Sequence, residues 1–149
     1  MFKSFKKKEP SYPADSRWSV CKGEYSGKLI FFRRNDSATE LVGHPDYRFR
    51  FGVAVPLKAP NEQGLPTDKE TGQLNVIEDI LSSRLEAERQ SLFVLAITTN
   101  GMREFVFYTR NTVASKAAFN RLQSEVTTHE LQMYIVEDPE WSVYKQFAK

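Results

Sequence analysis

The sequence has little of the chemistry that builds disulfide frameworks, metal centres or membrane spans. Its 149 residues include one cysteine, Cys21, and two histidines, His44 and His129. A single cysteine excludes an internal disulfide and fits a reducing compartment, so we expect a cytoplasmic protein. These three side chains are too few and too widely spaced for a zinc or iron site, so no metal is expected.

Long apolar runs and nucleotide-binding motifs are also missing. No apolar run reaches the roughly 18 residues that a transmembrane helix needs. The first residues carry positive charge without the apolar segment of a secretory signal. No glycine-rich phosphate-binding or dinucleotide-binding fingerprint occurs. We therefore expect neither membrane insertion nor a cofactor.

Positive charge is concentrated at the start of the chain, where the first four basic residues are Lys3, Lys6, Lys7 and Lys8. Of the 21 basic side chains, 17 remain after these lysines, against 19 acidic ones. The body is therefore not a basic surface, which counts against nucleic-acid binding. We expect residues 1–16 to form a basic extended tail and residues 17–149 to form a single α+β domain.

The strongest structural signal is Asn100-Gly101, which lies between two apolar runs and predicts a two-residue hairpin turn. This turn would place Ala96 opposite Phe105 and Val94 opposite Phe107. One face of the hairpin would then carry Val94, Ala96, Phe105 and Phe107; the other would carry Phe93, Leu95, Ile97, Val106 and Tyr108. Apolar residues on both faces indicate a central hairpin that is covered on both sides.

The remaining elements follow from periodicity. Strands are expected at 18–22, 28–34, 47–55 and 130–137, and a long loop at 58–72. Helices are expected around 74–85, after Asn111, and after Asp138-Pro139. From residue 47 to residue 137 the order is strand, helix, strand, strand, helix, strand, which is typical of a ferredoxin-like unit. The prediction is an α+β fold in which an N-terminal β-hairpin and a short C-terminal helix extend this unit.

Catalytic groups are scarce, which makes an enzyme the less favoured reading. Cys21 has no basic neighbour beyond Lys22 to lower its pKa. The alternative we keep is a small hydrolase or transferase that uses His44, Glu78 and Arg103 in a cleft roofed by the 57–72 loop. This alternative requires these side chains to converge within hydrogen-bonding distance.

A second alternative is RNA binding on the sheet. The segment 103–108, REFVFY, superficially resembles the aromatic box of an RNA-recognition motif, in which exposed rings stack on bases. The glycine positions of that box are missing, and Glu104 adds negative charge. RNA binding on the sheet requires Phe105 or Phe107 to be exposed to solvent.

Three segments carry a resemblance to a known family. They are residues 137–144, EDPEWSVY; residues 77–79, IED; and residues 98–109, TTNGMREFVFYT. Together they resemble the bacterial domain of unknown function 695 family, over about residues 18–144. The C-terminal half is similar in organisation to the B-type regulator of ribonuclease E, a small protein that inhibits an enzyme by binding it. The resemblance implies no catalytic residues and favours a binding role.

The leading hypothesis is a non-enzymatic module that binds and regulates a protein partner. Arginine and aromatic residues dominate interface hot spots, and the candidates here are Arg33, Arg103, Tyr108, Trp141 and Tyr144. The competing interpretation is that Trp141 and Tyr144 pin the last helix to the sheet. A homodimer is a further alternative, because unpaired sheet edges invite pairing.

Overall fold

The computed structural model describes residues 12–147, so most of the expected basic tail lies outside the described residues. The strands are β1 (Trp18–Tyr25), β2 (Lys28–Asn35), β3 (Phe49–Pro56), β4 (Ser91–Thr99), β5 (Met102–Thr109) and β6 (Gln132–Glu137). The α-helices are α1 (Asp68–Leu85), α2 (Thr112–Leu122) and α3 (Ser142–Gln146). Two short 3₁₀ helices, η1 (Asp36–Leu41) and η2 (Ala87–Arg89), complete the described elements.

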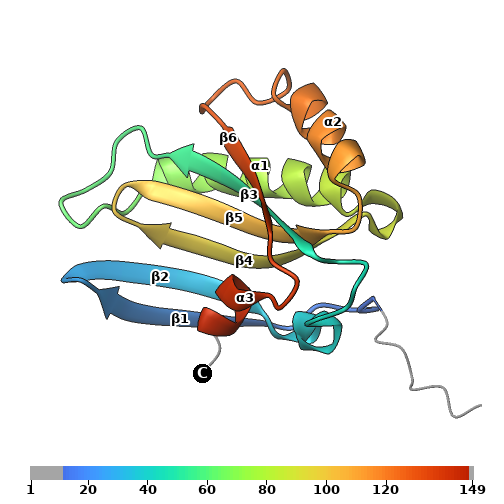
Figure 1. Ribbon diagram of the computed structural model, residues 1–149. Coiled ribbons are helices and arrows are strands. Elements are labelled where there is room, and N and C mark those ends of the chain that lie inside the picture. Colours follow the sequence, from blue (N-terminus) through green and yellow to red (C-terminus); the bar gives the residue numbers. More distant parts are fainter. Residues whose placement is uncertain (1–11, 148–149) are drawn as a thin grey trace, which may run out of the picture.

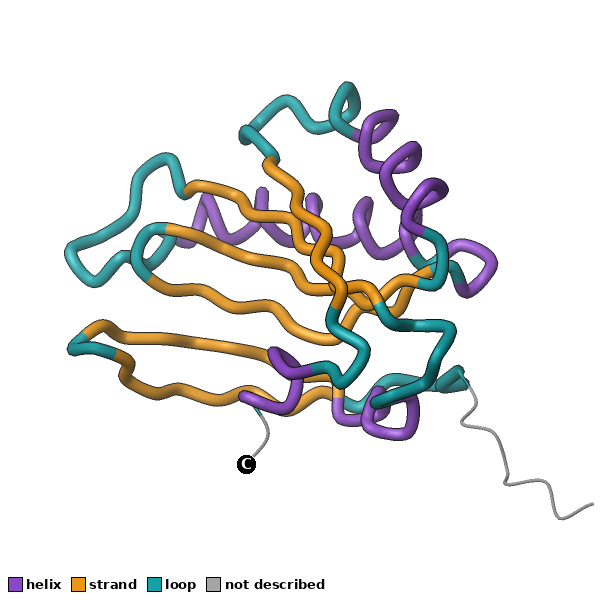
Figure 2. Tube along the Cα trace, viewed as in Figure 1, coloured by secondary structure: helices purple, strands orange, loops and turns teal. Residues whose placement is uncertain are grey.

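The strands form one antiparallel sheet in the order β1-β2-β4-β5-β3-β6. The segment from β3 to β6 has the strand order of a ferredoxin-like unit, and the β1–β2 hairpin extends its sheet beyond β4 (Figure 1). Helices α1 and α2 lie on one face, and α3 lies on the other (Figures 1 and 2). The predicted α+β fold is confirmed.

Two hydrophobic cores explain why the central hairpin is apolar on both faces. The core under α1 and α2 includes Phe51, Val53, Leu74, Ile77, Leu81, Phe93, Phe105, Phe107 and Phe119. The core on the α3 side includes Leu41, Tyr47, Val94, Leu95, Val106, Tyr108, Trp141 and Tyr144. Every strand of the hairpin therefore lies between two packed layers.

The β4–β5 turn forms at the predicted residues, with positive φ angles of 52° at Asn100 and 77° at Gly101. The register pairs Ala96 with Phe105 as expected. A bulge between Phe93 and Leu95 then brings Phe93, rather than Val94, opposite Phe107. The expected faces of Phe93 and Val94 were therefore wrong, because one extra residue reverses the alternation.

Helix α1 begins earlier than its apolar stripe indicates. Thr67 is its N-cap, and the Thr67 hydroxyl oxygen accepts a hydrogen bond of 3.2 Å from the backbone N–H of Glu70. The preceding loop is correspondingly shorter than the expected 58–72 segment. It is tied to the β4–β5 turn by a 3.0 Å hydrogen bond from the Gly101 N–H to the Gly64 carbonyl. A Cβ on Gly64 would lie 2.8 Å from the Gly101 nitrogen, so this close approach requires glycine.

Candidate functional site

Three of the predicted partner-binding residues lie in the α3-side core. Tyr108 and Trp141 are fully buried, and Tyr144 is 1% exposed. The Tyr108 and Trp141 rings stack with centroids 4.1 Å apart. The Trp141 indole N–H donates a 2.7 Å hydrogen bond to the Tyr47 carbonyl. Trp141 and Tyr144 therefore pin α3 to the sheet, and none of these three side chains presents a surface to a partner in this structure.

Asp138 links α3 to the strands below it. Its carboxylate accepts hydrogen bonds from the Ser142 N–H at 2.9 Å, the Tyr108 hydroxyl at 2.7 Å and the Arg50 guanidinium at 2.8 Å. Burial opposes ionisation of Asp138, but these bonds outweigh burial and lower its pKa from 3.8 to about 2. Burial, followed by the hydrogen bond to Asp138, raises the pKa of Tyr108 above its usual value. This cluster stabilises the fold.

The other two predicted binding residues lie together on the helix-side face of the sheet, near Glu78. The two terminal nitrogens of Arg33, on β2, donate to the two carboxylate oxygens of Glu78, on α1. The Arg33 guanidinium also lies 5.5 Å from the ring centroid of Trp18. Glu78 is thus held by an ion pair, and the charge of Arg33 is neutralised.

Arg103, on β5, has no such acidic partner among the described residues. Its Nε–H donates to the Thr98 hydroxyl oxygen on β4, and no ion pair within 12–147 involves its guanidinium. Burial lowers the pKa of Arg103 below its usual value, and the nearby charge of Arg33 lowers it further, against the opposing charge of Glu78. Arg103 is therefore a partly desolvated cation next to a second arginine.

His44 does not join this group. Its ring packs 5.8 Å from the ring of Tyr47, a residue of the α3-side core. Its Nδ1 accepts a 3.0 Å hydrogen bond from the Asp46 N–H. Glu78 lies on α1 across the sheet. The predicted acid–base arrangement of His44 with Glu78 is therefore not formed, although Glu78 and Arg103 do come close together.

Two hollows flank Arg33. One, of about 290 Å³, lies between α1 and the start of β1, and Trp18, Arg33 and Glu78 are among its lining residues. The other, of about 180 Å³, is lined by Val20, Phe31, Phe32, Arg33, Ala96, Thr98 and Arg103. Arg33 lines both hollows, whereas Arg103 lines only the smaller of the two.

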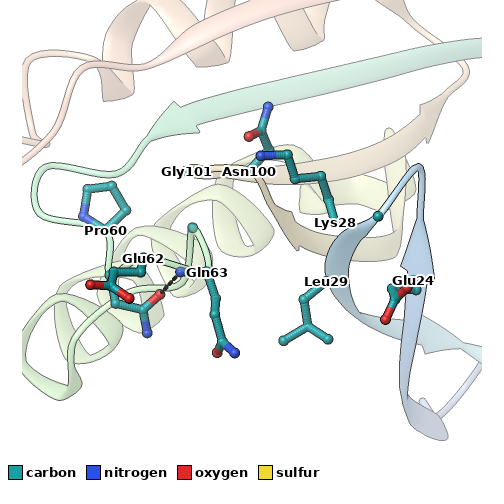
Figure 3. A pocket seen from close by; sticks show the side chains of 11 residues that line it. Glu24, Lys28, Leu29, Pro60, Glu62, Gln63, Asn100 and Gly101 are labelled. Atoms are coloured by element: carbon teal, nitrogen blue, oxygen red, sulfur yellow. Dashed lines mark hydrogen bonds between the residues drawn. The ribbon is translucent and has the colours of Figure 1, made fainter.

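The loop before α1 lines a different cavity, of about 500 Å³, between the β1–β2 and β4–β5 turns (Figure 3). Glu24 and Lys28 contribute from the β1–β2 hairpin, and Glu62 contributes from the loop. Neither Glu78 nor His44 lines this cavity. The cavity that this loop lines therefore does not extend to Glu78, as the expected cleft would require.

Glu70 and His129 form a buried pair that sequence reasoning missed. The two side chains are 5% and 0% exposed, and the Glu70 Oε2 lies 2.7 Å from the His129 Nε2. Glu70 also accepts hydrogen bonds from the backbone N–H groups of Lys58, at 2.6 Å, and Ala59, at 3.3 Å. Burial opposes ionisation of Glu70, but these bonds lower its pKa. The Thr67-x-x-Glu70 pattern marks the start of α1, and the pair joins α1 to the segment before β6.

The sheet does not expose the aromatic rings that RNA binding would require. Phe105 and Phe107 are both fully buried, in the core under α1 and α2. Burial by the helices leaves no ring face for a base, so the RNA-recognition alternative is wrong on its own criterion.

Metal ligation and membrane crossing were two properties not expected from the sequence. Within residues 12–147, no group of three or more His, Cys, Asp or Glu side chains is placed to hold a metal ion. No helix in the same range combines the length and apolar character needed to cross a bilayer. The surface around Arg33 and Arg103 is the candidate functional site, because there two of the predicted binding residues line one hollow.

Comparison with known proteins identifies the family without assigning an activity. The model of one family, described as a family of unknown function, matches residues 16–148. Curated proteins and solved structures give no significant match. Because the match covers nearly the whole chain, the protein belongs to this family of unknown function, DUF695.

Proposed function

We propose that the chain is a non-enzymatic module that binds a protein partner and thereby regulates it. The binding surface lies on the same side of the sheet as α1, on the strands that α1 does not cover. We call this surface the β1–β2 face; it comprises Val20 and Lys22 on β1, Phe31 and Arg33 on β2, and Arg103 on β5, which lines the same hollow. Two of the predicted hot-spot residues, Arg33 and Arg103, belong to it.

The observation that carries the proposal is the exposure of Val20. This side chain is 72% exposed in the middle of a strand that is paired on one edge only within residues 12–147. Helix α1 lies over the neighbouring strands, whereas no described helix lies over this face of β1 and β2 (Figure 1). An apolar sheet face flanked by arginines has the composition of an interface centre.

Charge complementarity indicates an acidic partner. Glu78 neutralises Arg33, so Lys22 and Arg103 are the two cations of the face that have no ion pair within residues 12–147. The N-terminal segment of this chain is a poor occupant, because its lysines, at 3, 6, 7 and 8, would meet like charge. A protein segment that combines apolar and acidic residues satisfies both features of the face.

The test is photo-cross-linking from the surface itself. A photoreactive amino acid is placed at Val20, and the matched control places it at Val113, on α2, which is 79% exposed. The proposal predicts one dominant protein adduct from position 20 in native lysate, resistant to nuclease, and no such adduct from position 113. Equal labelling from both positions, or nuclease-sensitive recovery alone, would contradict it.

A further inference from the structure

We propose that the hollow between Arg33 and Arg103 is a socket for one acidic side chain of the protein partner, with Arg103 as its anchor. This inference rests on the proposed function and adds the chemistry of the contact. It concerns the smaller hollow, of about 180 Å³, on the β1–β2 face.

The charges in the socket do not balance. Arg33 donates with both terminal nitrogens to Glu78, which compensates one cation with one anion. Arg103 is the remaining cation, and its one side-chain hydrogen bond within the described chain uses Nε and the neutral Thr98 hydroxyl. Its two terminal nitrogens are therefore available, and a carboxylate is the acceptor that best fits their planar fork.

The environment of Arg103 increases the binding free energy that a carboxylate would gain there. Burial of Arg103 removes water from its guanidinium, and the charge of Arg33 adds repulsion that the charge of Glu78 opposes. A cation that is partly desolvated before binding loses less hydration when a carboxylate arrives, so the net gain exceeds that of an exposed arginine. Arg48 is such an exposed arginine, already paired with Glu137 on the sheet edge.

The size and walls of the socket fit one side chain. Its volume of about 180 Å³ is below the roughly 300–1,000 Å³ typical of small-molecule sites. Val20, Phe31 and Ala96 provide apolar walls beside the two guanidinium groups. A glutamate or aspartate matches this arrangement, because its methylene groups would contact the walls and its carboxylate would reach Arg103.

The socket can be tested with a minimal probe, sodium butyrate, which combines a carboxylate with a short apolar stem. Arginine Nε–Hε and backbone amide resonances are followed by NMR at constant ionic strength, with butyramide as the uncharged control. We expect saturable shifts at the Arg103 Nε–Hε group and at the amides of Val20 and Phe31. Butyramide should cause less than a third of these shifts, and Arg48 should remain unchanged as the internal control.

Variants sharpen the result. Arg103→Gln should abolish the saturable shifts at Val20 and Phe31, whereas Arg48→Gln should leave them intact. If Arg103→Gln does not fold, the wild-type protein still tests the socket, because butyrate should shift the Nε–Hε resonance of Arg103 and not that of Arg48. Non-saturable shifts, equal effects of butyrate and butyramide, or binding that persists in folded Arg103→Gln would each overturn the socket.

The outcomes also separate this inference from the proposed function. Failure of butyrate to bind, with specific cross-linking from position 20 retained, would overturn the socket and leave partner binding in place. Butyrate binding without any cross-linked protein would overturn the proposed function, and with it the assignment of the carboxylate to a partner.

Discussion

Replacing Asp138 by Asn removes the charge that joins α3 to the sheet while keeping the size of the side chain. Asp138 is 6% exposed and is the acceptor for Arg50, Tyr108 and Ser142. Breaking a buried ion pair from one side costs roughly 3 kcal/mol or more, because the other charge is left uncompensated. We expect Asp138→Asn to lower the free energy of unfolding by about 3 kcal/mol at pH 7.

The pH dependence provides the sharper test. The pKa of Asp138 falls from 3.8 to about 2 on folding, so its ionised form stabilises the native state above pH 3.8, and this contribution is lost as the pH falls toward 2. A depression of this size corresponds to about 2 kcal/mol. The stability difference between wild type and Asp138→Asn, measured by urea unfolding, should therefore shrink by about 2 kcal/mol between pH 7 and pH 2.

The matched control is Glu137→Gln, which alters the adjacent carboxylate. Glu137 pairs with Arg48, but its side chain is 54% exposed, so we expect a change within about 0.5 kcal/mol at both pH values. An Asp138→Asn penalty that is the same at pH 7 and pH 2 would refute the assignment of the depressed pKa.

Two further changes test the packing on the α3-side face. Trp141→Ala should lower the free energy of unfolding by roughly 3–5 kcal/mol, because it removes a fully buried ring; a loss below about 1 kcal/mol in urea unfolding would contradict the core assignment. Gly52→Ala should cost roughly 1–3 kcal/mol, since its new Cβ would lie 2.1 Å from the Tyr134 ring. Gly52→Ala combined with Tyr134→Ala should cost less than the sum of the two single changes, and simple additivity would exclude this contact.

Local patterns predicted the order of the elements because each pattern is read within one segment. Asn100-Gly101 gave the correct turn and the register next to it. The bulge could not be foreseen, since Phe93 and Val94 are both apolar and either side chain can face either core. The start of α1 was missed because its first turns are polar and include Gly72, so no apolar stripe marks them.

The candidate site depended on long-range pairing, which local patterns do not report. Arg33 shares a face with Arg103 only because β2 pairs with β4 and places Arg33 opposite Ala96. The exposure of Val20 likewise depends on where α1 lies over the sheet. Conversely, Trp141 and Tyr144 are residue types that are common in hot spots, but they are buried because α3 covers the other face of the sheet.

Binding of a protein partner by the β1–β2 face can be measured as the affinity for the protein that is cross-linked from position 20. Val20→Glu removes an apolar contact and places a carboxylate beside Arg103, where it would compete with the partner for that guanidinium. We predict at least about a tenfold weaker Kd by calorimetry, because a tenfold change corresponds to about 1.4 kcal/mol and burying a valine supplies roughly 1.5 kcal/mol or more. The charge-matched control, Val113→Glu, should change Kd less than about twofold. Equal affinities for both variants and the wild type would contradict the claim.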